Sequence, residues 1–406
     1  MPLAITGAVL LVLGLVAVLT GLLPWPALGI LADRVVPILA FVAAITVVTE
    51  LLNASGLFDW FASHFRRWGR GRAFALWVLV AALSLAATVF LSLDTTAVLL
   101  TPIVVILAKR CGLAPLPFAL TAVWIANTGS LLLPVSNLTN LLALHALGDV
   151  SPGTFAARLA LPALWCAAVP LTAVAVLFRR ELAARYDLPG IRNVAAPAPR
   201  IPSSGPGATE PTVRAGGADR VLLALSGCVL VLLLPALVSG VPVWIPATAA
   251  AAVLTAAFGV RRRSALSWSL VPWQLIVFAA GLFVVMETLQ GLGARALAAG
   301  LLGSGEGPFD LVRVSAAGAL ASNAINNLPA YLALEQAAGS PARLVALLVG
   351  VNAGPLVTPW ASLATLIWHE QLRRLGVNIS WWGYAVAGVV LVPLLIVPAA
   401  LLAALA

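Results

Sequence analysis

Charged residues are scarce in this sequence, because Asp, Glu, Lys and Arg make up only 9% of its 406 residues while 62% are hydrophobic. A soluble globular domain has about 25% charged residues, so this chain has too little charge to cover a water-facing surface of its size. Its apolar residues form repeated runs of about 18 or more, the pattern of membrane-spanning helices. Strands of a transmembrane barrel would alternate apolar and polar residues instead. The sequence therefore predicts an all-α polytopic membrane protein.

Cysteine is nearly absent, and no nucleotide-binding loop is present. Cys111, Cys166 and Cys228 stand alone, without a CxxC pair or a Cys/His cluster. Neither a disulfide framework nor a metal site is therefore expected, and no cofactor is predicted. Because the P-loop motif is missing, the chain is not expected to hydrolyse ATP itself. An intramembrane enzyme would need a nucleophile and a base, and Ser92 near Asp94 has no histidine close in sequence, so no enzymatic activity is predicted.

The net charge of +9 comes from arginines in the connections between apolar runs. Clusters of these arginines lie at 66–72, 179–220, 261–263 and 373–374. The positive-inside rule places such connections in the cytoplasm. The charge therefore sets the orientation of the chain in the lipid bilayer, and nucleic acid is not predicted as a partner.

One segment, residues 179–219, is rich in proline, glycine, serine and arginine, a composition typical of a disordered linker. It divides the chain into a first transmembrane half, residues 1–178, and a second transmembrane half, residues 220–406. The arginines predict that this linker is cytoplasmic. The first apolar run has no basic region ahead of it, so it is predicted to be a span and not a cleaved signal peptide.

Two apolar runs of the first half are interrupted. Run 73–108 has basic residues at both ends, and as one straight helix it would be about 54 Å long, too long for a hydrocarbon core of about 30 Å. A helical hairpin that enters and leaves on the cytoplasmic side, with its turn near Asp94, satisfies both ends. Run 116–147 contains Gly129 and Pro134 among many amides and hydroxyls, so we expect a discontinuous helix there.

The second half repeats this scheme. Four residues of the first break recur in register: Asn127, Gly129, Pro134 and Leu138 correspond to Asn352, Gly354, Pro359 and Leu363. Run 342–368 is therefore predicted to be a second broken helix, and run 309–335, interrupted near Asn326, a second hairpin. Counting crossings from the cytoplasmic arginines relates the halves as an inverted-topology repeat. Matched interruptions of this kind mark the binding site of a secondary transporter.

Asp94 is the acidic residue in the middle of its apolar run. A charged side chain at the membrane centre costs about 2.5–3.5 kcal/mol on insertion scales, so such a residue is usually functional. We predict that Asp94 carries a proton or neutralises a cation; alternatively, it caps the helix that begins at Thr95. By contrast, Glu50, Glu287 and Glu335 lie near the ends of their runs and are predicted to face water.

Neutral polar residues gather at the same interruptions. Their amides and hydroxyls, beside the ends of half-helices, would suit a small polar solute or an ion. Alternatively, they only satisfy backbone groups freed by proline and glycine, or hold helices together. The candidate substrate-binding residues are Thr95, Asn127, Thr128, Ser130, Ser136, Asn137, Asn140, Asn323, Asn326, Asn327, Asn352, Thr358 and Ser362.

Four motifs occur in order along the chain. Residues 94–102 read DTTAVLLTP, residues 130–140 read SLLLPVSNLTN, residues 326–329 read NNLP, and residues 354–366 read GPLVTPWASLATL. These motifs resemble those of the arsenite/antimonite permease family. That family belongs to the ion transporter superfamily, which also holds sodium/proton antiporters and dicarboxylate symporters. The resemblance extends over nearly the whole chain outside the linker.

The resemblance implies a multi-pass protein of the bacterial inner membrane that exports arsenite or antimonite in exchange for protons by alternating access. Some members work with a separate ATPase subunit. Carried over by position, Asp94 would be the proton-linked acid, and the breaks and the Asn326–Asn327 turn would hold the substrate. A neutral trihydroxide suits such amide and hydroxyl groups without any thiol.

Three positions depart from the family pattern. Leu93 stands where the family has an asparagine, Asn127 where it has an acidic residue, and Leu356 where it has a basic residue. Fewer charges in the site leave open an altered coupling. They also leave open another substrate of the superfamily, through sodium/proton exchange or sodium-coupled transport of a dicarboxylate-like anion.

Overall fold

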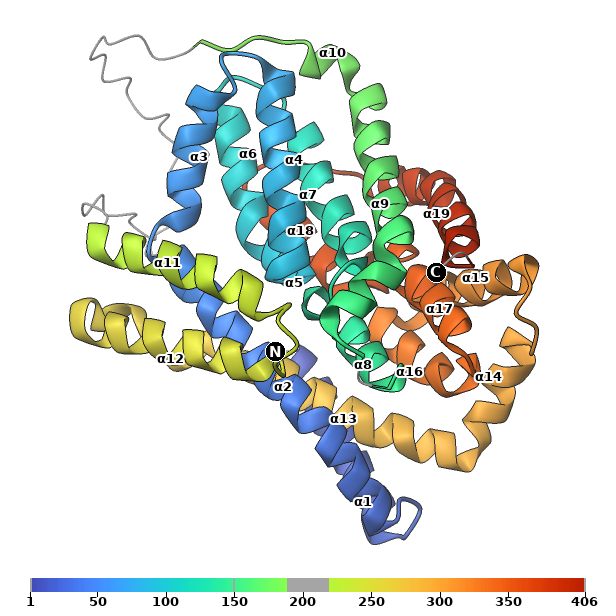
Figure 1. Cartoon of the computed structure of the whole chain (residues 1–406). Coiled ribbons are helices and arrows are strands. Elements are labelled where there is room, and N and C mark those ends of the chain that lie inside the picture. The colour runs from blue at the N-terminus through green and yellow to red at the C-terminus, as the bar shows by residue number, and fades with distance from the viewer. Residues whose placement is uncertain (1, 149, 188–218, 405–406) are drawn as a thin grey trace, which may run out of the picture.

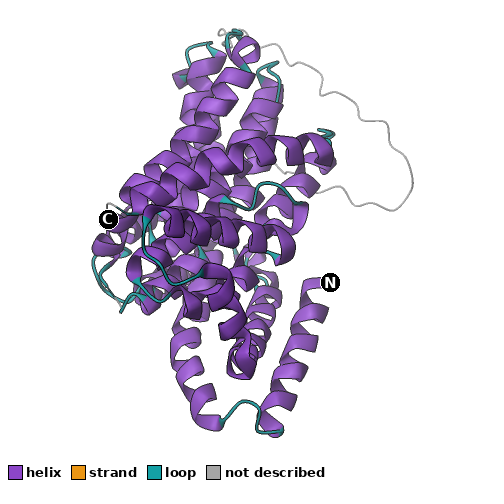
Figure 2. Cartoon of the chain, turned by 90° about the vertical axis from the view of Figure 1, so that its right-hand side faces the viewer, coloured by secondary structure: helices purple, strands orange, loops and turns teal. Residues whose placement is uncertain are grey.

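The computed structural model describes residues 2–148, 150–187 and 219–404, and this part of the chain is helical without a strand (Figure 2). The all-α class is thereby confirmed for these residues. The helices before the predicted linker are α1 (Pro2–Leu19), α2 (Trp25–Ala54), α3 (Leu57–Trp68), α4 (Ala73–Phe90), α5 (Leu93–Thr95), α6 (Thr101–Arg110), α7 (Leu116–Thr128), α8 (Leu138–Ala146) and α9 (Pro152–Leu177). Next come α10 (Arg179–Leu182), α11 (Arg220–Ala236), α12 (Trp244–Arg261), α13 (Trp273–Leu289), α14 (Arg295–Leu302), α15 (Pro308–Ile325), α16 (Asn327–Ala338), α17 (Pro341–Ala353), α18 (Leu363–Arg374) and α19 (Trp381–Ala403).

Six helical segments among these residues are apolar and long enough to cross a membrane by length and composition: α2, α4, α9, α12, α19 and the stretch from α13 into α14. Their outward faces are apolar as well as their packed faces. On α9, for example, Leu164 is 68% exposed, and on the shorter α11 Leu232 is 71% exposed. Helices that are apolar on all sides are typical of membrane spans.

Three described residues other than glycine have positive φ: Arg70, in the turn before α4, and two residues at which the chain bends between helices. Ser92 (φ 151°) separates α4 from α5, and Asn326 (φ 93°) separates α15 from α16. Both side chains cap the following helix: the Thr95 amide donates to Ser92 Oγ over 3.2 Å, and the Leu328 amide donates to Asn326 Oδ1 over 3.3 Å. Such backbone conformations cost about 1–3 kcal/mol and gather at functional sites.

Two further helices are broken without a sharp bend. Between α7 and α8 the chain forms two short 3₁₀ turns, Gly129–Leu131 and Pro134–Ser136. Between α17 and α18 it forms the 3₁₀ turn Pro359–Ala361. Proline lacks an amide proton and fixes φ, so Pro134 and Pro359 each start a turn that cannot continue the preceding helix.

The predicted linker is only partly described, because residues 188–218 lie outside the described part. Its first residues are not disordered, contrary to the prediction. Arg179–Leu182 forms α10, the Tyr186 amide donates to Gly71 O over 2.9 Å, and the Tyr186 hydroxyl donates to Arg66 O over 2.8 Å. These contacts fasten the first residues of the linker to the turn before α4, which composition alone does not reveal.

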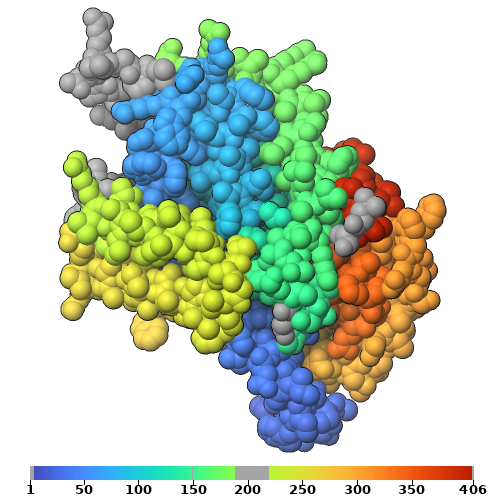
Figure 3. All heavy atoms as spheres, in the orientation of Figure 1, coloured from blue at the N-terminus to red at the C-terminus, as the bar shows by residue number. Residues whose placement is uncertain are grey.

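The two parts of the chain interlock around the bends and breaks. Figure 1 shows α6 and α7 beside α18, while α15, α16 and α17 lie on the other side of α8 and α9. The indole of Trp368 on α18 donates to Ala119 O on α7 over 2.8 Å, and both side chains are fully buried. Figure 3 shows α11 and α12 along one flank and α1 projecting at the bottom.

Close backbone contacts fix the outer helices. At Gly388 on α19 an added Cβ would lie 2.0 Å from Leu356 O, so α19 packs directly against the break between α17 and α18. Helices α11 and α12 are joined at their ends by Asp219 and Arg261, whose Oδ2 and Nε are 2.8 Å apart. The hydrogen bond from Arg261 lowers the pKa of the Asp219 carboxyl group, which also caps α11.

Candidate functional site

A cavity of about 230 Å³ lies where the two bends and the two breaks meet. One side of its wall comes from these four interruptions: Ser92, Leu93, Asp94 and Thr95; Val135, Asn137, Leu138 and Leu141; Asn326, Asn327 and Leu328; and Ser362, Leu363 and Ile367. Helices α5, α8, α16 and α18 therefore all begin at this cavity. The N-terminal ends of helices carry partial positive charge and unpaired amide groups, which suit oxygen atoms of a ligand.

The rest of the wall comes from α2, from the region of α13 and from the helical turn after α5. It consists of Phe41, Val42, Ile45, Thr46, Thr49 and Glu50 on α2, of Pro272, Leu275 and Phe278, and of Val98 and Leu99. A mostly apolar wall with a few convergent polar groups is typical of a small-molecule site.

The Asp94 carboxyl group lies on this wall without a hydrogen-bond partner among the described residues. The cap of α5 is Ser92, so the alternative prediction that Asp94 caps this helix is wrong. The Thr95 amide at the start of this helix already donates its hydrogen bond to Ser92 Oγ. A carboxylate on a mostly apolar cavity that is not used in the fold is free to exchange a proton or meet a cation.

The predicted substrate residues divide into two groups. Those on the cavity wall, besides Asp94, are Thr95, Asn137, Asn326, Asn327 and Ser362. Those away from it are Asn127, Thr128, Ser130, Ser136, Asn140, Asn323, Asn352 and Thr358. Among the wall residues Ser362 is fully buried, and its Oγ has no hydrogen-bond partner among the described residues. An unpaired buried hydroxyl on a cavity points to a ligand or water as its partner.

Asn352 connects the two broken helices, although it does not reach the cavity. Its Oδ1 accepts from Asn137 Nδ2 over 2.9 Å and from Thr139 Oγ1 over 2.8 Å, and its Nδ2 donates to Asn140 Oδ1 over 2.7 Å. All four residues are buried. Because Asn137 lies on the cavity wall, Asn352 positions a wall residue from behind.

Asn323 plays a comparable part beside the second bend. Its Nδ2 donates to Gly354 O over 2.8 Å, and its Oδ1 accepts from the Thr358 amide over 3.0 Å. The Thr358 hydroxyl in turn donates to Asn323 O over 2.7 Å. These bonds attach α15 to the break between α17 and α18.

The remaining polar residues of the first break bond to nearby groups. Asn127 Nδ2 donates to Val123 O over 3.0 Å and to Thr365 Oγ1 over 3.3 Å, while its Oδ1 has no partner among the described residues. Thr128 Oγ1 donates to Trp124 O over 2.9 Å. Ser130, Ser136 and Asn140 bond to main-chain carbonyls of the same break; for example, Asn140 Nδ2 donates to Ser130 O over 2.6 Å. These residues hold the break in shape.

Glu335 does not face water as predicted, because it is only 8% exposed. Glu50 is half-buried and lies on the cavity wall, a position that was not assigned to it from the sequence. The sequence does contain a local pattern that could have placed Glu50 at a polar site, because Thr46 and Glu50 are four residues apart on α2 and therefore share a helix face. For Glu335 the partner is Arg34, which lies 301 residues away in sequence, so no local pattern could reveal it.

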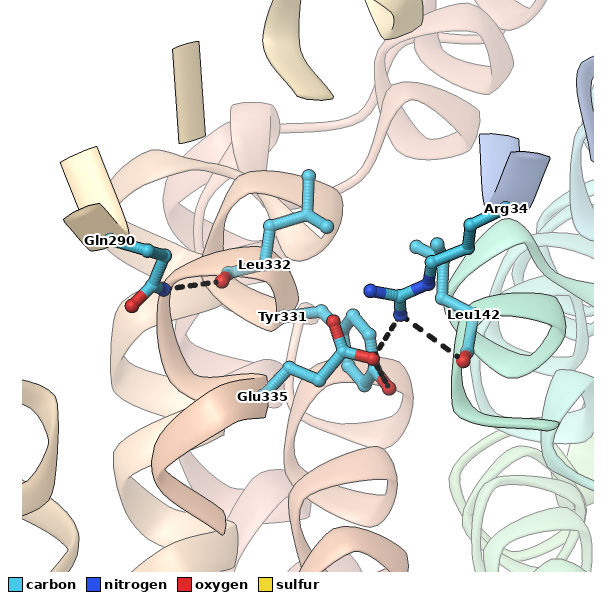
Figure 4. A network of polar contacts seen from close by, with 6 residues as sticks. All are labelled: Arg34, Leu142, Gln290, Tyr331, Leu332 and Glu335. Carbon is cyan, nitrogen blue, oxygen red and sulfur yellow. Dashed lines mark hydrogen bonds and ion pairs between the residues drawn. The ribbon is translucent and has the colours of Figure 1, made fainter. Parts of the chain in front are cut away.

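Arg34 and Glu335 form an ion pair between α2 and α16 (Figure 4). Arg34 Nη2 also donates to Leu142 O on α8 over 3.3 Å, and the Tyr331 hydroxyl donates to Glu335 Oε1 over 3.1 Å. Gln290, after α13, donates to Leu332 O over 3.0 Å. This network joins four elements around the cavity but is not part of its wall.

The protein can be placed in a family by comparison with known proteins. A family model described as citrate transporter matches residues 2–342, most of the chain. The chain belongs to the citrate transporter family. Its relatives in this comparison include arsenical pump membrane proteins of Yersinia enterocolitica and Escherichia coli, each 31% identical over 89% of this chain and 84% of the relative. The resemblance to the arsenite/antimonite permease family is thereby confirmed.

The fold agrees with this family. The crystal structure of the Alcanivorax borkumensis YdaH transporter matches with a TM-score of 0.56, covering 99% of this chain and 97% of that chain at 16% identity. At this identity the match shows a shared fold alone. Family membership and the apolar helices together make the chain an integral membrane transporter.

Proposed function

We propose that this protein is a secondary transporter that exports arsenite or antimonite across the bacterial inner membrane in exchange for protons. The observation that carries the proposal is the cavity with Asp94, at which both bends and both breaks meet. The arsenical pump names of the relatives supply the substrate class. The proposed exchange is driven by the proton gradient alone, so a separate ATPase subunit is not required for it.

The wall of the cavity suits a neutral polyhydroxylated solute. Arsenite is a neutral trihydroxide near pH 7, and the amides of Asn137 and Asn327 and the hydroxyl of Ser362 can bond its hydroxyl groups. No lysine or arginine belongs to the described wall, whereas Asp94 and Glu50 do. A multiply charged anion would meet like charge there and lose affinity.

The proposed cycle alternates the access to this cavity. Asp94 takes up a proton when the cavity opens outward, and it releases that proton when the cavity opens to the cytoplasm, where arsenite binds. The matched interruptions in 73–147 and 309–368 support an inverted-topology repeat whose two states are related by this exchange. The arginine clusters support a cytoplasmic position for residues 179–219.

A second candidate is uptake of a citrate-like anion, which the citrate transporter model favours. The helix N-terminal ends at the cavity would attract a carboxylate. The two wall carboxylates and the absence of a described cationic wall residue favour arsenite over it. A third candidate is sodium/proton exchange, which other members of the superfamily carry out and which would use the same Asp94.

Growth of an arsenic-sensitive bacterial host tests the proposal. Expression of the chain is expected to raise the arsenite and antimonite concentrations that stop growth, and Asp94→Asn is expected to abolish the gain at equal membrane expression. Tolerance to sodium, or growth on citrate, in place of arsenite resistance would instead support one of the other two candidates.

A further inference from the structure

Glu50 is a second carboxyl group on the wall of the cavity, and it comes from α2, whereas Asp94 comes from the bend before α5. We propose that Glu50 is the residue through which the coupling proton passes between Asp94 and the cytoplasm. This inference rests on the proposed function, because it assigns a role in the same exchange.

The position of Glu50 along α2 gives the direction of the relay. The wall residues of α2 extend from Phe41 to Glu50, a distance of about 13 Å at 1.5 Å per residue. Glu50 is at the end of this stretch that is nearest to Ala54, where α2 ends. The next helix, α3, carries Arg66 and Arg67 in its last turn, so the positive-inside rule places this end of the cavity on the cytoplasmic side.

The charged groups around Glu50 leave its carboxyl group free to exchange a proton. On the cavity wall, Asp94 is the other acidic residue. Arg262, after α12, donates Nη1 to Ala54 O over 2.8 Å and so caps the end of α2. On α3 the acid Asp59 is exposed, and on α11 Arg220 is exposed.

The ionisable groups of the other elements packed on α2 lie elsewhere. Glu287 of α13 lines a small pocket together with Arg34 and Glu335, toward the opposite end of α2. His145 of α8 interacts electrostatically with Glu335 of the same network. Arg261 of α12 is paired with Asp219. None of these contacts involves the Glu50 carboxyl group.

A second observation, independent of both acids, indicates that this space holds a ligand. The Ser362 hydroxyl lies on the same wall, is fully buried and has no partner among the described residues.

With the cavity open to the cytoplasm, the Asp94 carboxylic acid gives its proton to the Glu50 carboxylate, directly or through one water molecule. Glu50 then gives a proton to cytoplasmic water, and Asp94 is left as a carboxylate. Only O–H bonds break and form.

Transport measurements on purified protein in lipid vesicles can distinguish loss of the proton relay from loss of arsenite transport. Two rates are measured: arsenite exchange at equal pH on both sides, which needs no net proton movement, and arsenite uptake driven by a pH gradient. Glu50→Gln removes the exchangeable proton at nearly constant shape, and Glu50→Asp keeps one. Asp33→Asn, an exposed carboxylate on the same helix, is the matched control. Elution as a single species in detergent checks the fold.

We expect Glu50→Gln to lower gradient-driven arsenite uptake by about 100-fold more than it lowers arsenite exchange, the size of effect typical of a lost proton-transfer group. Glu50→Asp is expected to retain gradient-driven uptake, and Asp33→Asn to match the wild type. Gradient-driven uptake by Glu50→Gln at the wild-type rate would overturn the relay, as would a fall of both rates by the same factor in a folded variant. Absence of arsenite exchange in the wild type would instead overturn the proposed function.

Discussion

Ser362 separates a ligand-binding role from a structural one at the scale of a single residue. Its hydroxyl is buried on the cavity wall and has no partner among the described residues. If a substrate hydroxyl is its partner, Ser362→Ala removes one hydrogen bond worth about 0.5–1.5 kcal/mol and raises the apparent KM for arsenite by roughly two- to thirteenfold. The unfolding temperature is expected to stay equal or to rise, because no bond of the fold is lost. An unchanged KM would contradict the assignment.

Asn352 is the opposite case, since its side chain bonds to protein groups and not to the cavity. Asn352→Ala leaves polar atoms of Asn137, Thr139 and Asn140 buried without a partner, at about 1–3 kcal/mol for each group. We expect a lower unfolding temperature in detergent together with a raised KM, because Asn137 loses its position on the wall. Asn53→Ala, which removes a half-buried amide without a described side-chain bond, is the control and should change neither quantity.

At the scale of elements, the ion pair between α2 and α16 predicts a pattern over three variants. Arg34→Met leaves Glu335 buried without its cation, and Glu335→Met leaves Arg34 without its anion. Removing one partner of a buried pair costs about 3–5 kcal/mol, whereas replacing both by apolar residues is often neutral. Each single variant should therefore unfold at a lower temperature than the double variant. Equal unfolding temperatures for all three would show that the pair does not hold these helices together.

The contact of α19 with the broken helix predicts a difference between two glycines of one helix. A Cβ at Gly388 would lie 2.0 Å from the backbone oxygen of Leu356, while a Cβ at Gly383 would come no nearer than 3.9 Å to Ser380 Cβ. Gly388→Ala should lower the unfolding temperature and the transport rate, since the break must shift. Gly383→Ala should stabilise the fold slightly, by about 0.5–1 kcal/mol, because alanine favours a helix. The same response at both positions would contradict this packing.

At the scale of the whole molecule, composition was sufficient to predict an all-helical membrane protein, because so few charges cannot cover a soluble surface. Glycine and proline also marked where helices are interrupted, as at Pro134 and Pro359, since their effect on the backbone is local. The same local chemistry failed for Arg179–Leu182, where a segment of linker composition is helical.

Which polar residues line the cavity could not be predicted from the sequence, because it depends on contacts between distant segments of the chain. Near a break the sequence shows which residues are polar, but not which of them turn to the cavity, so Asn137 and Ser362 could not be distinguished from Asn352. Glu50 was predicted only to face water, because its place on the cavity wall depends on helices that are distant from α2 in sequence. Arg34 and Glu335 are 301 residues apart, so no local sequence pattern indicates that they pair.

We propose that Asp94 couples arsenite movement to protons in the cavity at which the interruptions meet. Arsenite accumulation in everted membrane vesicles is the decisive measurement, made with an imposed proton gradient for the wild type and Asp94→Asn, and with sodium and citrate as competing solutes. We expect gradient-dependent accumulation of arsenite by the wild type and none by Asp94→Asn. Equal accumulation by the two proteins, or accumulation of sodium or citrate in place of arsenite, would contradict it.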